Sequence, residues 1–235
     1  MDVTQNITTD SRVTPGDVMQ LLGEEYGSVS WAPRFDPASE LVYTILSQHT
    51  SDTNSERAFR NLVGRFGSLD SIADAEVSEI EGVIRTAGLF RVKALRIKAV
   101  LNRVRDELGS FDLSFLRDMP LGEAKTWLKR LDGIGPKTAA IILCFSLGMP
   151  AMPVDTHIFR VTKRLGFIGA KVTADQAHDL LESMLDSDDV FAFHLYLINH
   201  GREVCKSQRP RCEQCVLAWG CPSKALLERR KVGIN

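Results

Sequence analysis

The chain has 235 residues, of which 44% are hydrophobic and 25% are charged, so it can bury a core as one domain or as two small ones. No apolar run approaches the length of a membrane span, which excludes a membrane-spanning protein. The formal net charge of -1 excludes a uniformly basic nucleic-acid-binding chain, although acidic and basic residues are segregated along the sequence.

The first helix signals follow a polar N-terminal segment. Residues 1–12 are expected to be a disordered tail, and they lack the apolar core of a signal peptide, which indicates a cytosolic protein. Thr14-Pro15 and Asp36-Pro37 each place a capping side chain before a proline, which is typical of a helix start.

Further helix signals occur in the middle of the chain. Asp52 is predicted to cap a helix that ends at Phe66, before Gly67. Basic residues recur between Arg91 and Arg105, as expected for a solvated helix face. Because no convincing strand alternation is present, the sequence predicts an all-α fold.

The most informative segment reads LDGIGPKTA and covers residues 131–139. Gly133 and Gly135 can adopt positive φ without steric penalty, so the chain can turn tightly with its backbone N–H groups directed outward, which suits a phosphate. Pro136 fits the first position of a helix. Lys137 would then lie in the first turn, where the helix dipole favours the neutral amine that a nucleophile requires.

Two more helices are predicted after this turn. Residues 138–147 form an apolar run that predicts a buried helix, and Thr173 is expected to cap another helix that reaches about Leu185. Asp155 lies between them, eighteen residues after Lys137, in the segment PVDTHIFR. Its carboxylate fits a catalytic role beside the lysine and equally fits a helix N-cap, and both roles can hold together.

Four cysteines near the C-terminus indicate a metal site. They are Cys205, Cys212, Cys215 and Cys221, with the spacing C-x6-C-x2-C-x5-C. Disulfides are disfavoured in a cytosolic protein. Four-cysteine zinc sites usually pair two C-x2-C knuckles and only one is present, so the spacing favours an iron–sulfur cluster and leaves zinc open. The fifth cysteine, Cys144, is expected to be a buried small hydrophobic residue.

Together these motifs resemble the endonuclease III family of helix-hairpin-helix DNA glycosylases, over about residues 15–222. LDGIGPKTA is similar to the family's hairpin, VDTHIFR to its catalytic-aspartate segment, and HGREVC with the later cysteines to its iron–sulfur loop. The resemblance implies a 4Fe-4S cluster on the four cysteines. It also implies that Lys137 is the Schiff-base nucleophile and that Asp155 is the catalytic carboxylate.

The resemblance implies DNA contacts as well. They are Gly133, Ile134 and Gly135 of the hairpin, with a bound monovalent cation; Leu89; and Gln48 or His49. Independently of the resemblance, Lys206, Arg209 and Arg211 are expected to contact phosphate, because they would lie on a rigid loop held by the metal. Leu89 resembles the wedge that enters the base stack, although it also fits a core leucine. The family most often has glutamine at the position of His49, so either Gln48 or His49 would fill the gap left by a flipped base.

The implied architecture has two helical domains that flank a DNA-binding cleft. Residues 13–38 and 150–225 would form the iron–sulfur domain, residues 39–149 a six-helix domain with the helix-hairpin-helix motif, and residues 226–235 a C-terminal tail.

The implied function is that of a bifunctional DNA glycosylase and AP lyase, a monomer associated with the nucleoid. It would act on double-stranded DNA that contains damaged bases, foremost oxidised pyrimidines, or abasic sites, and would cleave by β-elimination. Lys137 disfavours an adenine-DNA glycosylase. A glycosylase for alkylated or mismatched bases and a non-catalytic DNA-binding protein remain alternatives.

Overall fold

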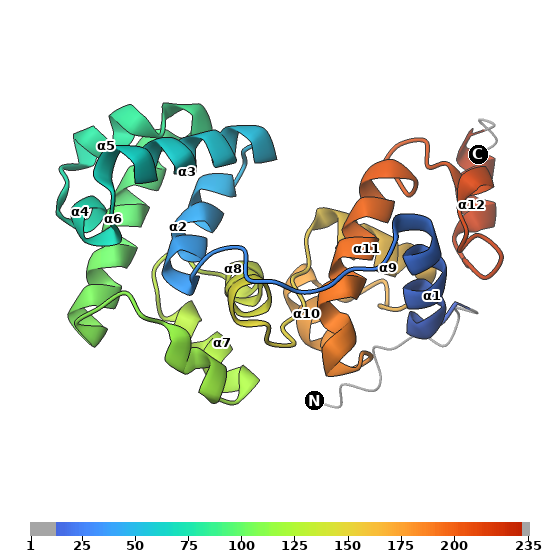
Figure 1. Cartoon of the computed structure of the whole chain (residues 1–235). Helices are drawn as coiled ribbons and strands as arrows, with labels where there is room; N and C mark the ends of the chain where they lie inside the picture. The colour runs from blue at the N-terminus through green and yellow to red at the C-terminus, as the bar shows by residue number, and fades with distance from the viewer. Residues whose placement is uncertain (1–12, 232–235) are drawn as a thin grey trace. The chain divides into compact units, whose positions relative to one another are not determined.

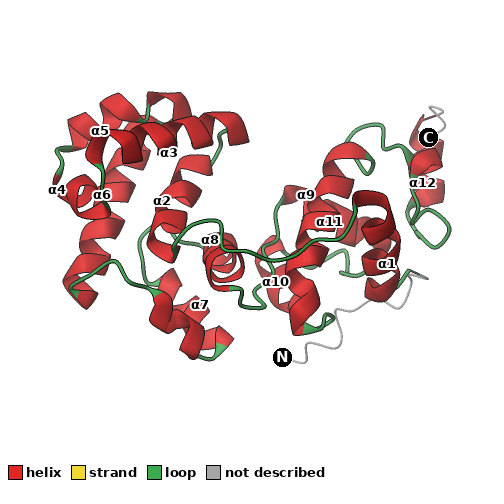
Figure 2. Cartoon of the chain, in the orientation of Figure 1, coloured by secondary structure: helices red, strands yellow, loops and turns green. Residues whose placement is uncertain are grey.

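The computed structural model describes residues 13–231, in which all regular structure is helical (Figure 2). The all-α prediction is therefore confirmed for this part of the chain. The tail expected over residues 1–12 lies outside the described residues. Within 13–231, none of the helices combines the length and the apolar character needed to cross a membrane.

The chain divides into two compact units, Met1–Trp31 with Pro150–Asn235, and Ala32–Met149. The first unit contains α1 (Pro15–Tyr26), α9 (Thr156–Leu165), α10 (Ala174–Glu182), α11 (Val190–Glu203) and α12 (Lys224–Lys231), as Figure 1 shows. The second contains α2 (Pro37–Ser47), α3 (Asp52–Phe66), α4 (Leu69–Asp74), α5 (Val77–Val83), α6 (Phe90–Leu108), α7 (Leu121–Lys129) and α8 (Pro136–Ile141).

The second unit has one α-helix more than the six expected. The additional helix arises because α4 and α5 are separate: Ala75 has an extended backbone with ψ 150°, and Glu76 then caps α5. The unit also begins earlier than residue 39. The N–H of Arg34 donates to the carbonyl of Phe145 at 3.2 Å, which ties the segment before α2 to the end of the unit.

Capping side chains set most of the helix starts. The predicted caps at Thr14 and Asp36 are confirmed, since each side chain accepts a backbone N–H in the first turn of its helix. The prediction for α3 is wrong by one residue: Ser51 is the N-cap and Asp52 is the first helical residue, because Ser51 retains the extended backbone of a cap. Gly67 ends α3 as predicted.

The buried helix predicted over residues 138–147 changes type midway. After α8 the chain continues as a π-helix over Ile142–Ser146. The N–H of Arg34 donates to the carbonyl of Phe145, and the side chain of Arg117 donates to the carbonyl of Leu147 at 3.0 Å. These two carbonyls at the end of the helix therefore bond to groups outside it.

In the first unit, α11 packs against both α1 and α9. Gly201 permits the close approach of α9, since a Cβ at this position would lie 2.9 Å from Cβ of His157. Helix α10 ends at Glu182, three residues before the expected Leu185. Residues 226–231, expected as part of a tail, belong to α12.

Candidate functional site

The hairpin places Lys137 at the surface. Gly133 has φ 80°, as predicted, but Gly135 has φ -89° and ψ 179°, an extended conformation that any residue adopts. Positive φ is therefore needed at one glycine only. Ile134 anchors the turn, because its side chain is buried and its N–H donates to the Leu131 carbonyl at 3.1 Å. Lys137 is exposed and is the second residue of α8, in the first turn as predicted.

Asp155 is the N-cap of α9, as the sequence predicted. Its Oδ1 accepts the N–H of Ile158 at 2.8 Å, and the residue is half-buried. The cap fixes the position of the carboxylate relative to the helix. Asp155 belongs to the first unit, whereas Lys137 belongs to the second.

Three side chains, to none of which the sequence analysis assigned a catalytic role, hold the segment before Asp155. The Nδ1 atoms of His178 and His194 lie 2.7 Å and 2.9 Å from the carbonyls of Met152 and Pro153, respectively. Oε1 of Glu182 accepts the N–H of Met152 at 2.8 Å. These contacts come from α10 and α11, so the approach to Asp155 is fixed by tertiary structure that local sequence does not encode.

The loops predicted to contact DNA have an unusual backbone. Among the described residues, the non-glycine residues with positive φ are His49 (53°), Leu89 (45°) and Arg209 (48°). All three are among the residues that the sequence analysis expects to contact DNA. Left-handed backbone is strained for such residues and often marks functional sites.

Leu89 is 60% exposed, so the alternative of a core leucine is wrong. His49 is also exposed, whereas Gln48 is half-buried and its Oε1 accepts a hydrogen bond from Arg96 at 3.0 Å. Arg96 also lies against the hairpin: its Cδ would be 3.5 Å from a Cβ built on Gly133. The loops that carry His49 and Leu89 belong, with the hairpin, to the second unit.

The basic residues from Arg91 to Arg105 do not form a uniformly solvated face. Lys93 is only 2% exposed, because it lies on the side of α6 that also buries Ile97 and Val104. The prediction of a solvated face is therefore wrong at this position. The helical spacing of Lys93 from these apolar residues was the sequence signal that could have indicated its burial.

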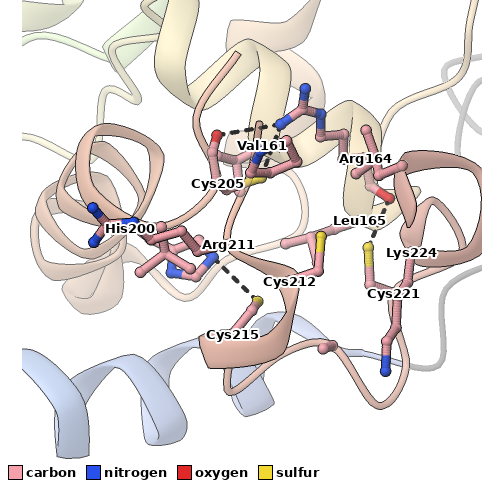
Figure 3. A pocket seen from close by; sticks show the side chains of 14 residues that line it. Val161, Arg164, Leu165, His200, Cys205, Arg211, Cys212, Cys215, Cys221 and Lys224 are labelled. Atoms are coloured by element: carbon pink, nitrogen blue, oxygen red, sulfur yellow. Dashed lines mark hydrogen bonds between the residues drawn. The ribbon is translucent and has the colours of Figure 1, made fainter. Parts of the chain in front are cut away.

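The four cysteines line one pocket in the first unit (Figure 3). The side chain of Arg164 donates to Sγ of Cys205 at 3.4 Å, and Nε2 of His200 lies 3.5 Å from Sγ of Cys215. Among the described residues, no three His, Cys, Asp or Glu side chains are grouped as ligands of a single metal ion. All four sulfur-bearing side chains nevertheless line the same pocket.

The surroundings of these thiols are partly apolar. Burial raises the pKa of Cys215 to about 11, and burial also raises the pKa of Cys221. Burial lowers the pKa of His200 to about 4, so its imidazole is neutral near pH 7. A thiolate set in this environment requires a cationic partner, which a metal centre supplies.

The cations of the cysteine loop lie beside this pocket. Arg209 and Arg211 are exposed, and Lys206 is half-buried. Arg164 holds the backbone of this loop, since its guanidinium donates to the carbonyls of Lys206 at 2.7 Å and Ser207 at 3.0 Å.

Comparison with known proteins places these motifs in a family. An endonuclease III of Sulfolobus acidocaldarius is 34% identical over 183 residues, which cover 77% of this chain and 79% of that protein. The endonuclease III of Thermotoga maritima is 31% identical over 79% of this chain and 83% of that protein. A DNA glycosylase of Arabidopsis thaliana is 36% identical over 71% of this chain, and the match spans only 57% of the plant protein.

Solved structures share the fold. A non-covalent complex of endonuclease III with DNA matches with a TM-score of 0.78 at 24% identity, over 92% of this chain and 99% of the other. A thermostable thymine-DNA glycosylase matches with a TM-score of 0.73 at 20% identity, over 90% of this chain and 95% of the other. Residues 42–186 match the family model described as HhH-GPD superfamily base excision DNA repair protein. The chain therefore belongs to the HhH-GPD superfamily of base excision DNA repair proteins and, within it, to the endonuclease III family.

Proposed function

We propose that this protein is a bifunctional DNA glycosylase and AP lyase that removes damaged bases, oxidised pyrimidines foremost, through a Schiff base on Lys137. The observation that carries this proposal is an exposed lysine in the first turn of α8, directly after a glycine hairpin, in a member of a base excision repair superfamily. A cytoplasmic, nucleoid-associated location accords with such a function.

A stacked base shields the sugar C1′ atom, so the nucleotide must first rotate out of the duplex. Leu89 enters the base stack, and Gln48 or His49 occupies the vacated space. The exposure of Leu89 and His49 supports these roles. His49 is favoured over Gln48, because the Gln48 amide already bonds to Arg96.

The chemistry begins at Nζ of Lys137. The neutral amine attacks C1′, the bond from C1′ to the base breaks, and the base leaves with a proton. Opening of the sugar at O4′ gives the imine. Loss of a proton from C2′ then expels the 3′ phosphate, which cleaves the strand by β-elimination.

The carboxylate of Asp155 stabilises positive charge that develops on the sugar and assists proton transfer. Because the helix cap uses Oδ1, Oδ2 is available to the substrate. A carboxylate that is fixed before the substrate arrives needs little reorganisation during the reaction.

The phosphate backbone is bound without regard to sequence. The exposed backbone of Gly133 and Gly135 binds a phosphate, with a monovalent cation as intermediary. The N–H of Ile134 contributes less than the sequence suggested, because it is engaged within the turn. Exposed Arg209 and Arg211 add contacts to the backbone.

The four cysteines would hold a 4Fe-4S cluster. They fit this group because all four line one pocket, and four cysteine thiolates are the usual ligand set of such a cluster. Arg164 and His200 lie near two of the sulfurs. A bound cluster would fix the loop, and no step of the proposed reaction requires it.

Borohydride trapping tests the nucleophile. The wild-type protein is expected to form a covalent complex with oligonucleotides that carry oxidised or abasic sites, and Lys137→Gln is expected to lose this complex while retaining binding to damaged DNA. Lys129→Gln is the matched control, because Lys129 is also exposed and ends the helix before the hairpin. Undiminished trapping by Lys137→Gln would remove Lys137 from this role. Oligonucleotides with deaminated and alkylated bases separate the substrate classes.

A further inference from the structure

The buried ammonium of Lys93 joins two loops that are distant in sequence. Its Nζ donates to the carbonyl of Leu46 at 2.6 Å, to Oγ1 of Thr50 at 2.6 Å and to the carbonyl of Ala87 at 2.7 Å. Leu46 is in the last turn of α2 and Thr50 is in the loop that follows, whereas Ala87 ends the short helix before Gly88. One side chain thus contacts both of these connections.

The three acceptors suit a cation. The carbonyls of Leu46 and Ala87 are at helix C-termini, where the last carbonyls lack partners within the helix and the dipole favours positive charge. All three acceptors are neutral oxygens, and burial lowers the pKa of Lys93 to about 8. A buried cation without a carboxylate is a weak source of stability, since its desolvation offsets much of what its hydrogen bonds contribute.

The two loops are the ones that carry the strained residues His49 and Leu89, with φ 53° and 45°. Such a backbone persists only where the surrounding structure fixes it. Lys93 fixes both sides: its side chain contacts Thr50 and Ala87, and its own N–H donates to the Leu89 carbonyl at 3.0 Å. The hydroxyl of Thr50 donates in turn to the Ala87 carbonyl, which closes the network directly between the loops.

We propose that Lys93 is a positioning residue that holds the loop of His49 and the loop of Leu89 in a fixed position relative to each other. Insertion of the Leu89 wedge and filling of the vacated space by the other loop then occur as one movement. The inference rests on the proposed function, because it assigns those two tasks to the loops. Lys93 does not touch the reacting sugar in this account. It acts on the step that opens the duplex.

Removal of the ammonium tests the proposal. Lys93→Met retains a long apolar stem, loses all three hydrogen bonds and is the principal variant. We expect its single-turnover excision rate on duplex DNA to fall about ten- to a hundredfold, since a misplacement of about 1 Å can cost about 10²-fold. Borohydride trapping on a single-stranded abasic oligonucleotide is expected to be unchanged, because that substrate requires no opening of the duplex.

A spectroscopic readout isolates the opening step. In a duplex with 2-aminopurine opposite an abasic-site analogue, the wild-type protein is expected to raise the fluorescence by unstacking the reporter base, and Lys93→Met is expected to reduce that rise at saturating protein. Lys98→Met is the matched control. Lys98 is also on α6 and donates to a carbonyl, that of Ala75 at 2.6 Å, but it does not contact either loop.

The outcomes separate the inference from the proposed function. If the wild-type protein forms no trapped complex on either the duplex or the single-stranded substrate, the proposed function fails. If the wild-type protein traps and Lys93→Met behaves like Lys98→Met on duplex DNA, the inference alone is overturned. An equal loss on both substrates in a folded Lys93→Met protein also overturns it, because the residue would then be merely structural.

A second variant decides the matter if Lys93→Met does not fold. Thr50→Val removes the hydroxyl between the loops at nearly constant volume and keeps the ammonium on its two carbonyls. It is expected to slow duplex excision in the same direction and to spare single-stranded trapping. Wild-type rates on the duplex would overturn the inference.

Discussion

At the scale of single residues, Asp155 combines the helix cap that the structure shows with the chemical task that we propose for it. The backbone N–H of Ile158 bonds to Oδ1, which starts α9, and the proposed reaction uses the negative charge. Asparagine caps helices about as well as aspartate does, but it carries no charge. The two tasks are therefore separable by substitution.

Asp155→Asn is expected to slow single-turnover base excision sharply while leaving the free energy of unfolding nearly unchanged. Asp155→Ala is expected to slow excision similarly and also to lower the free energy of unfolding by about 1 kcal/mol, because the cap is lost. Excision kinetics and urea denaturation measure the two effects. Near wild-type excision by Asp155→Asn would contradict the chemical role.

The roles of residues that depend on their sequence neighbours were predictable from the sequence. The roles of residues that depend on distant partners were not. The caps at Thr14 and Asp36 follow from a side chain and the three residues after it. The role of Lys93 depends on Leu46 and Ala87, which are far from each other in sequence. From its charge, Lys93 was grouped with the solvated cations of α6. Its helical spacing from Ile97, however, places both residues on the same buried side of the helix.

At the scale of elements, the contact between α9 and α11 depends on the absence of a side chain. A Cβ at Gly201 would lie 2.9 Å from Cβ of His157 and 3.3 Å from Cγ2 of Val161. Neither atom is the far end of a flexible chain. A larger residue would therefore force the two helices apart, and α9 is the helix that Asp155 caps.

Gly201→Ala is expected to lower the free energy of unfolding by about 1–3 kcal/mol through overpacking. Gly64→Ala in α3 is the control, since a Cβ there meets nothing within 4 Å. This control is expected to raise stability by about 0.5–1 kcal/mol, because alanine loses less backbone entropy than glycine on folding. Denaturant titration measures both variants, and a neutral Gly201→Ala would show that the helices can separate without loss.

Element boundaries show the limit of reading a sequence locally. The start of α8 follows from Pro136, but its change to a π-helix after Ile141 was not predicted. The carbonyls of Phe145 and Leu147 at the end of that helix bond to the Arg34 backbone and the Arg117 side chain, from remote segments. No pattern within residues 138–147 encodes them.

At the scale of the whole molecule, the chain distributes the proposed machinery over two units. Lys137, the hairpin and the two loops tied by Lys93 belong to Ala32–Met149. Asp155 and the four cysteines belong to the other unit. The sequence motifs assigned both sets of residues, whereas the boundary near residue 32 depends on the contacts of Arg34 and was not predicted.

Loss of one of the proposed cluster ligands is expected to affect the cysteine loop as a whole. Cys212→Ala should lose the visible absorbance of the purified protein together with most of its affinity for damaged DNA, because the loop cations would no longer be fixed. Cys144→Ala is the control: Cys144 is buried in the other unit, so colour and DNA affinity should persist. A folded, colourless Cys212→Ala protein with full affinity would contradict the role of the loop. Absorbance spectra and binding titrations provide the comparison.

The left-handed backbone at His49, Leu89 and Arg209 has a thermodynamic implication for the free protein. Glycine would relieve the strain at each position. The side chain at each position therefore lowers the free energy of unfolding by about 1 kcal/mol relative to glycine. Stability alone would favour the smaller residue. The molecule is therefore expected to sit below its attainable melting temperature before it meets DNA, as a compromise between durability and activity.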